Sequence, residues 1–213
     1  MITTRGIDNV VKVHESAEIS KSTISIIGKN NKLIFNEGVK IRSSNIRLKG
    51  ENITLVVDNN VEMTGVIASL FPSCSLKLGK DTTMGNGELT IAEGCDVVIG
   101  KDCMFAHGYD IRTSDMHPIY DLKNGKRINY GSSIIIGDHV WFGRNVFVQK
   151  GVTIANNIVV GARSVVSRSL ITPNSIAVGI PAKIIKEGIV WGRKMYHQTM
   201  YDDPTLKFII NDL

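Results

Sequence analysis

The fold of this chain of 213 residues is decided by residues 136–166, IGDHVWFGRNVFVQKGVTIANNIVVGARSVV. Large apolar residues return at every sixth position, at Ile136, Phe142, Val148, Ile154, Val160 and Val166. The residues three positions after the anchors are His139, Asn145, Gly151, Asn157 and Arg163. This second set is enriched in residue types that tolerate left-handed backbone angles. Each hexad therefore predicts a short strand and a turn, with the anchor pointing inward.

Three such strands form a triangular coil of about 18 residues, and stacked coils bury their anchors in one continuous column. The same register returns upstream at Ile91, Ile99, Phe105 and Ile111. Cys95 and Cys103 then occupy a smaller inward position, four residues after an anchor, and we interpret them as buried structural cysteines. Residues 24–90 predict wider coils of the same solenoid, and residues 1–23 its irregular first part.

The composition agrees with an all-β solenoid, since 29 Ile and 20 Val stand against 11 Leu. The net charge of +5 comes without a block of Lys or Arg, which argues against a nucleic-acid partner. No apolar run approaches the roughly 18 residues of a transmembrane helix. The first residues lack the apolar core of a signal peptide, so we expect a cytoplasmic protein. The three cysteines form no Cys-x-x-Cys pair, and neither a disulfide framework nor a zinc site is expected.

The register fails once in the C-terminal half, over residues 112–133. A solenoid that extrudes a polar loop places side chains where its walls cannot, so this loop is the expected active-site loop. It contains His117, and Pro118 biases that residue toward extended geometry. We expect one β-helix domain over residues 1–187, followed by a partly helical C-terminal tail over residues 188–213.

Four motifs carry a resemblance to a known family. They are SDMHP at 114–118, DLKNGKRIN at 121–129, GDHVWFG at 137–143 and GIPAKIIK at 179–186. Together with the hexads they resemble the hexapeptide-repeat acetyltransferases, and within these the capsular polysaccharide and polysialic acid O-acetyltransferases. The resemblance implies a left-handed parallel β-helix, a homotrimer, and acetyl-CoA bound in the groove between subunits. It also implies transfer of acetyl to a sugar hydroxyl of a capsular or other surface polysaccharide, including one that contains sialic acid.

His117 and Trp141 are the predicted catalytic residues. Acetyl transfer to a hydroxyl needs a general base, and a neutral imidazole suits this task. His117 is the only histidine in the extruded loop and matches the family's catalytic histidine; the others fall in the first part (His14), in or beside turns (His107, His139) or in the tail (His197). Strand alternation turns Trp141 outward, and by resemblance it lines the acetyl-CoA site. Packing between subunits is the alternative role for this indole.

Eight further residues match cofactor positions of the family. They are Gly143, Arg144, Gly161, Ala162, Ser167, Arg168, Lys183 and Lys186. The resemblance places the first four beside the pantetheine arm, where small residues permit close backbone approach. It places the last four near the adenosine phosphates, where cations are expected, and Arg163 is a further candidate there. For the saccharide acceptor, Asp115 and Arg127 are the predicted binding residues. Asp115 has two alternative roles, orienting His117 or capping the loop, and Lys126 is a second basic candidate.

Three alternatives compete with this interpretation. The first is N- or O-acetylation of a small sugar or nucleotide-sugar precursor, which differs only in the acceptor. The second is a zinc lyase of the gamma carbonic anhydrase kind, which needs three imidazoles on zinc. That family pairs two histidines five residues apart, whereas Leu122 stands five residues after His117. The third is a non-catalytic β-helix scaffold, in which His117 and Trp141 would have no chemical role. We expect acetyl-CoA as the donor and no metal.

Overall fold

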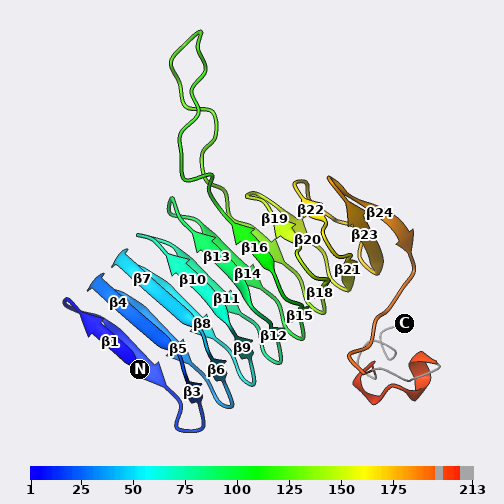
Figure 1. Ribbon diagram of the computed structural model, residues 1–213, viewed down its shortest axis with the longest axis horizontal. Helices are drawn as coiled ribbons and strands as arrows, with labels where there is room; N and C mark the ends of the chain where they lie inside the picture. The colour runs from blue at the N-terminus through cyan, green and yellow to red at the C-terminus, as the bar shows by residue number, and fades with distance from the viewer. Residues whose placement is uncertain (195–198, 207–213) are drawn as a thin grey trace.

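The computed structural model describes residues 1–194 and 199–206, and its coils stack side by side along the long axis of the molecule (Figure 1). Each complete coil contributes one strand to each of three sheets, so paired strands are neighbours in the stack and not in the sequence. The predicted all-β solenoid is confirmed. Within the described ranges, helix is limited to two 3₁₀ turns, η1 (Met200–Asp202) and η2 (Pro204–Leu206).

The first sheet has eight strands: β1 (Ile2–Arg5), β4 (Thr23–Lys29), β7 (Asn45–Glu51), β10 (Val66–Leu70), β13 (Gly87–Ile91), β16 (Tyr109–Arg112), β19 (Phe147–Val148) and β22 (Val165–Val166). The second has seven: β2 (Val10–Val13), β5 (Lys32–Phe35), β8 (Thr54–Val57), β11 (Ser75–Leu78), β14 (Asp96–Ile99), β17 (Ile134–Ile136) and β20 (Thr153–Ile154). The third has nine: β3 (Glu18–Ser20), β6 (Lys40–Arg42), β9 (Glu62–Thr64), β12 (Thr83–Met84), β15 (Met104–Phe105), β18 (Trp141–Phe142), β21 (Ile158–Val160), β23 (Ser175–Gly179) and β24 (Ala182–Glu187). The pairs are parallel except β23 with β24, an antiparallel hairpin that ends the stack.

The coils narrow along the chain, as the sequence predicts. Ile24 pairs with Ile46, 22 residues later, in the wide N-terminal part of the stack. Ile136 pairs with Ile154, 18 residues later, in the part that the hexads occupy. Three strands of two or three residues with three tight turns need only 18 residues, whereas the longer N-terminal strands need more.

The anchors form one continuous apolar core. All six hexad anchors between residues 136 and 166 are at most 1% exposed. The ring of Phe142 stacks on that of Phe105 in the coil before it, with centroids 4.1 Å apart. The three cysteines are buried and free, which confirms the structural role expected for Cys95 and Cys103. Burial raises the pKa of the Cys103 thiol to about 12, so this thiol stays protonated and unreactive at neutral pH.

The corners of the coil use left-handed residues at the predicted positions. The five turn residues have φ angles of +54° (His139), +60° (Asn145), +75° (Gly151), +53° (Asn157) and +60° (Arg163). Such an angle reverses the chain within one residue, and Asn and Gly adopt it at little cost. The hexad therefore encodes both the buried wall and the turn that follows it.

Two segments leave the stack, and Figure 1 shows them at opposite edges. The extruded loop rises between β16 and β17, at the corner between the first and second sheets. The C-terminal segment after β24 turns back and lies at the far side of the coil. No helix in the described part of the chain is long and apolar enough to cross a membrane. The division into a domain over residues 1–187 and a tail over residues 188–213 stays a prediction.

Candidate active site

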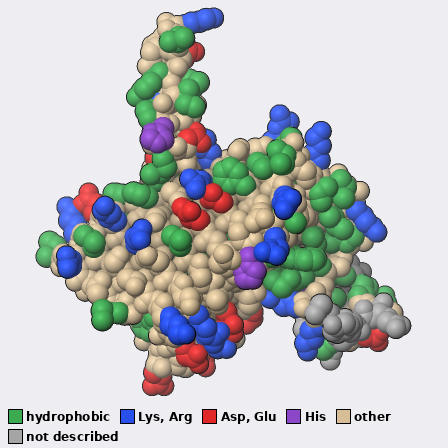
Figure 2. Space-filling model, in the orientation of Figure 1, with side chains coloured by type: hydrophobic (Ala, Val, Ile, Leu, Met, Phe, Trp, Pro, Cys, Tyr) green, Lys and Arg blue, Asp and Glu red, His purple; other side chains and the backbone are tan. Residues whose placement is uncertain are grey.

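The extruded loop carries His117 away from the body of the β-helix. Figure 2 shows the loop as a narrow projection with hydrophobic side chains along its stem. The imidazole of His117 is exposed, and the main chain around it is held by Asn129 on the returning strand of the loop. The Asn129 amide donates to the His117 carbonyl at 2.8 Å and accepts from the Ile119 N–H at 2.7 Å. These two hydrogen bonds lie on either side of Pro118, and they fix the main-chain position from which the imidazole of His117 projects.

Asp115 joins the loop to the wall of the coil. Its carboxylate accepts hydrogen bonds from the Asn129 amide at 2.7 Å and from the ammonium of Lys150. Lys150 also donates to the Asn129 carbonyl at 3.1 Å. The hydrogen bonds from Lys150 and Asn129 lower the pKa of the Asp115 carboxyl below its ordinary value. Asp115 thus stabilises the loop that presents His117, and its predicted contact with the acceptor stays a prediction.

A second group of hydrogen bonds, which we call the clasp, holds the base of the loop and centres on Glu93. The sequence pattern did not single out this residue. Its carboxylate accepts from Arg127 at 2.8 Å, from the Gly131 N–H at 3.0 Å, and from the Ser114 hydroxyl. These hydrogen bonds, that from Arg127 first, lower the pKa of the Glu93 carboxyl to about 2. The guanidinium of Arg127 also lies 5.0 Å from the centroid of the Tyr130 ring. Arg127 is therefore part of the loop's own structure, and its predicted role toward the saccharide stays a prediction.

A small cavity of about 180 Å³ lies where the loop meets the first sheet. Its lining residues are Arg112, Ser114, Asp115, Phe147, Gln149 and Lys150. The cavity combines one apolar ring with amide, hydroxyl and charged groups. Lys126, the other basic candidate, is exposed farther along the loop and does not line this cavity.

Trp141 lies on β18 in the third sheet, with its neighbour Phe142 fully buried. Its indole is half-buried on the outer face, in register with Met104 and Val159 of the neighbouring strands. The alternation that the sequence predicted is confirmed. These three side chains, continued by Ile176 in register with Val159 on the next strand, make an apolar strip on the outer wall, which suits packing against a ligand or another chain.

The turns predicted to accompany the pantetheine arm lie directly above one another, at the corner between the third and first sheets. The Arg163 N–H donates to the Arg144 carbonyl at 2.8 Å, which joins the two turns. A Cβ atom on Gly143 would lie 2.6 Å from the nitrogen of Ala162, so only glycine fits there. At Gly143, Gly161 and Ala162 the turns present main chain and small side chains, which permit close approach of an extended ligand. Arg144 and Arg163 in the same turns are exposed.

The four phosphate-site candidates do not lie together in one chain. Lys183 and Lys186 are on β24, two strands beyond β21 in the third sheet. Ser167 and Arg168 follow β22, at the corner between the first and second sheets, which is also where the loop begins. The chain therefore places His117, Ser167 and Arg168 at one corner. Trp141, Lys183 and Lys186 lie on the third sheet, which does not border the corner between the first and second sheets.

The structure differs from the sequence prediction at His139, which was expected in a turn or at the surface. It does occupy a turn, but it is only 3% exposed. Its Nδ1 lies 2.7 Å from the Asp102 carboxylate and its Nε2 lies 2.8 Å from the Trp191 carbonyl oxygen. The residue that covers it, Trp191, comes from the tail, 52 positions later, so no local pattern could indicate this burial. His197 lies outside the described residues.

No metal centre accompanies these groups in the described part of the chain. Within residues 1–194 and 199–206, no three side chains of His, Cys, Asp or Glu are grouped to hold a metal ion.

A hexapeptide-type parallel β-helix with a histidine-bearing loop and glycine-lined turns is the architecture expected of the hexapeptide-repeat acyltransferases, and the relatives of the chain belong to that class. No protein-family model matches the chain. It is 55% identical over 206 residues to the polysialic acid O-acetyltransferase of Neisseria meningitidis, covering 97% of this chain and 96% of that protein. The chain therefore belongs to the polysialic acid O-acetyltransferase family, and it is an acetyltransferase.

Other relatives agree with this assignment. The chain is 39% identical over 126 residues to the polysialic acid O-acetyltransferase of Escherichia coli O1:K1, covering 59% of this chain and 41% of that protein. A crystal structure of a polysialic acid O-acetyltransferase superposes with a TM-score of 0.95 at 55% identity, covering 97% of this chain and 98% of the other. That of a polySia-specific acetyltransferase gives 0.90 at 31% identity, covering 100% and 97%. The left-handed parallel β-helix implied by the resemblance is thereby confirmed.

Proposed function

We propose that this enzyme transfers acetyl from acetyl-CoA to a hydroxyl group of polysialic acid or of a closely related capsular polysaccharide that contains sialic acid. The observation that carries the proposal is the 55% identity to a polysialic acid O-acetyltransferase over 206 residues, which extends beyond the repeat to nearly the whole chain. Similarity limited to the hexads would indicate the fold but not the acceptor.

In this proposal His117 is the general base. Its imidazole accepts the proton of the sugar hydroxyl while that oxygen attacks the thioester carbonyl. The tetrahedral intermediate then collapses: the carbon–sulfur bond breaks, the acetyl ester forms, and the imidazolium returns its proton to the thiolate of CoA. An exposed imidazole on the extruded loop, on a main chain held by Asn129, is free to meet both substrates.

We further propose that the site forms between copies of the chain in a homotrimer. His117 and Trp141 lie on different parts of one coil, so a single chain does not assemble the expected catalytic pair. The loop also exposes apolar side chains, among them Ile119 (53%), Tyr120 (58%) and Leu122 (102%). Exposed apolar groups in such density are typical of an interface. Packing of the loop against a neighbouring coil would cover them and bring His117 to that neighbour's wall.

Acetyl-CoA would then lie along the third sheet and its corner with the first. Trp141 would contact the acetyl end, and Gly143, Arg144, Gly161 and Ala162 the pantetheine arm. Lys183 and Lys186 would face the adenosine phosphates, joined by Ser167 and Arg168 from the neighbouring copy. Adjacent strands are spaced by about 4.8 Å, so the three steps from β18 to β24 would accommodate roughly 14 Å of an extended ligand. Because acetyl-CoA is made inside the cell, we expect the enzyme to act in the cytoplasm.

The test is an acceptor comparison. Purified enzyme is incubated with acetyl-CoA and either polysialic acid, free sialic acid or a nucleotide-activated sialic acid, and products are analysed by mass spectrometry. The expected result is acetylation of the polymer, with an acetyl group that mild base removes, as it does an ester and not an amide. Acetylation of the monomers alone, or a base-stable acetyl group, would contradict the proposal.

A further inference from the structure

The C-terminal segment after β24 runs back across the corner between the second and third sheets and binds one coil after another. The Ile189 carbonyl accepts from the Asn157 amide at 2.9 Å, and the Trp191 carbonyl accepts from His139 at 2.8 Å. Arg193 reaches the coils before these. Alternate residues of an extended segment thus meet successive turns of the solenoid. We call residues 189–193 the strap.

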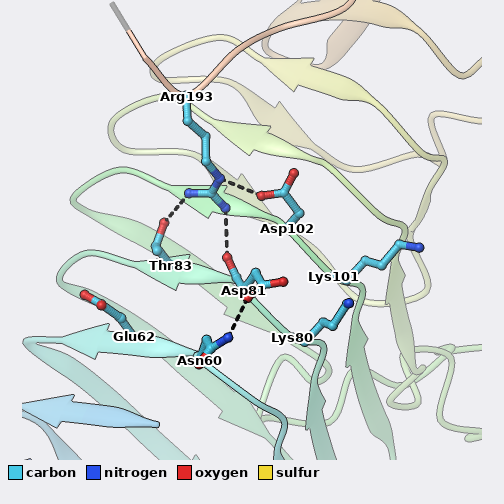
Figure 3. A pocket seen from close by; sticks show the side chains of 8 residues that line it. All are labelled: Asn60, Glu62, Lys80, Asp81, Thr83, Lys101, Asp102 and Arg193. Atoms are coloured by element: carbon cyan, nitrogen blue, oxygen red, sulfur yellow. Dashed lines mark hydrogen bonds and ion pairs between the residues drawn. The ribbon is translucent and has the colours of Figure 1, made fainter. Parts of the chain in front are cut away.

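Arg193 anchors the strap through all three guanidinium nitrogens (Figure 3). Its Nε donates to the Asp102 carboxylate at 2.6 Å and its Nη1 to the Thr83 hydroxyl at 2.9 Å. Its Nη2 donates to the carbonyls of Asp81 at 3.0 Å and Cys103 at 2.8 Å. The four acceptors come from two coils, and only a planar fork can meet them together. The same side chain forms one wall of the pocket of about 560 Å³ that Figure 3 shows.

Asp102 links the anchor to the buried histidine. One oxygen of its carboxylate accepts from Arg193 at 2.6 Å, and the other is in hydrogen-bond contact with His139 Nδ1 at 2.7 Å. Burial alone would raise the pKa of the Asp102 carboxyl, but these two hydrogen bonds outweigh burial and hold the pKa below its ordinary value. The carboxylate therefore stays charged, and it orients both partners at once.

Trp191 contacts both His139 and Trp141, and so it connects the Arg193 anchor to the proposed acetyl-CoA site. Its indole N–H donates to the His139 carbonyl at 2.8 Å, and its ring stacks on the imidazole with centroids 4.1 Å apart. The indole of Trp141 lies 5.8 Å away, tilted by 42°. Trp191 is only 6% exposed, so it is a fixed wall beside Trp141.

We propose that the strap is a positioning element for the acetyl-CoA site, in which Arg193 locks Trp191 and Trp191 holds the indole of Trp141 at the angle that the donor requires. The inference rests on the proposed function, because that function gives Trp141 its ligand. Arg193 and Trp191 are positioning residues and are not expected to touch the reacting atoms.

The two tryptophans are the only ones in the chain, which gives a direct readout. Two tilted indoles at this distance couple in circular dichroism, so the wild type should show an exciton couplet in its spectrum. Arg193→Ala should lose the couplet and raise the KM for acetyl-CoA at least about fivefold, with kcat changed less than twofold, as expected when uniform binding is lost. Arg193→Lys should recover little, and Lys194→Ala, at the exposed neighbour, should match the wild type.

Trp191→Ala provides the second variant, since it keeps the Arg193 anchor and its ion pair while removing the wall beside Trp141. It should raise the same KM by a similar factor. An unchanged KM in both variants would overturn the inference, even if thermal stability falls, because the strap would then be structural only. If the wild type itself transfers no acetyl group, the proposed function fails and the inference fails with it. If the wild type transfers acetyl and both variants keep its KM for acetyl-CoA, the inference about the strap fails while the proposed function stands.

Discussion

The side-chain amide of Asn129 donates a hydrogen bond of 2.8 Å to the main-chain carbonyl of His117 across the stem of the extruded loop. The same amide nitrogen reaches the Asp115 carboxylate at 2.7 Å, and that carboxylate also binds Lys150 on the wall of the coil. One side chain therefore connects the proposed base to the rigid solenoid. A base carried on a loop contributes to catalysis only if its position is restricted.

Asn129→Ala should lower kcat about tenfold or more and leave the KM for acetyl-CoA nearly unchanged, because it frees the main chain at His117 without touching the donor site. Steady-state kinetics with both substrates varied measures this split. Asn124→Ala, at an exposed residue of the same loop, serves as the matched control and should behave as the wild type. Equal kcat in the two variants would show that the bond does not position the base.

His117→Ala should lower turnover at least about a hundredfold, the contribution typical of a general base. Acetyl-CoA should still bind, because no cofactor contact is assigned to this side chain. Turnover is measured by thiol release from acetyl-CoA and binding by titration calorimetry. Wild-type turnover in the variant would remove His117 from the mechanism, whereas loss of binding would reassign it to the donor site.

Glu93→Gln tests the clasp at the base of the loop through its pH dependence. Folding lowers the pKa of the Glu93 carboxyl from 4.5 to about 2. Such a group stabilises the folded chain above its unfolded pKa, and this stabilisation is lost as the pH falls through the folded pKa. The wild type should therefore have a Tm about 2–4 °C above that of the variant from pH 7 to pH 5. The difference should shrink between pH 4.5 and pH 2.

Thermal unfolding followed by circular dichroism at several pH values measures this difference. Glu37→Gln, at an exposed turn of the N-terminal coils, provides a control for removing one carboxylate. A Tm difference that stays constant down to pH 2 would show that the charge of Glu93 does not hold the loop.

Gly28→Ala should be among the most destabilising changes in the wide coils. Gly28 has a φ of +124°, and a Cβ there would lie 1.8 Å from the carbonyl oxygen of Gly50 in the next coil. Because neighbouring backbone must move, we expect a loss of more than about 3 kcal/mol. Gly94→Ala, with a φ of +65° and open space around the new methyl group, should cost only about 1 kcal/mol. Denaturant unfolding measures the free energy of unfolding of both variants. Equal losses of stability would contradict the prediction that close backbone contact between coils makes Gly28 the costlier residue to replace.

The sequence alone predicted much of the solenoid because its constraints are local. Each hexad supplies an inward anchor and a left-handed turn residue, and the equivalent residues of the next coil stack directly on them. The buried Phe142 and the turn at Asn145 follow directly from that repeat. A break in a strict repeat is equally visible, and so the loop that carries His117 could be predicted without any tertiary information.

What the sequence could not predict depends on residues brought together from distant parts of the chain. Glu93 and Arg127 are 34 positions apart, and Arg193 and Thr83 are 110 apart. No periodicity links such pairs, because the loop and the strap are not part of the repeat. His139 looked like any turn residue until Trp191 covered it. The sequence therefore determined the wall, its turns and the place of the loop that carries His117. The tertiary structure decided which side chains hold that loop and which lie beside Trp141, since only folding brings the loop and the strap onto their coils.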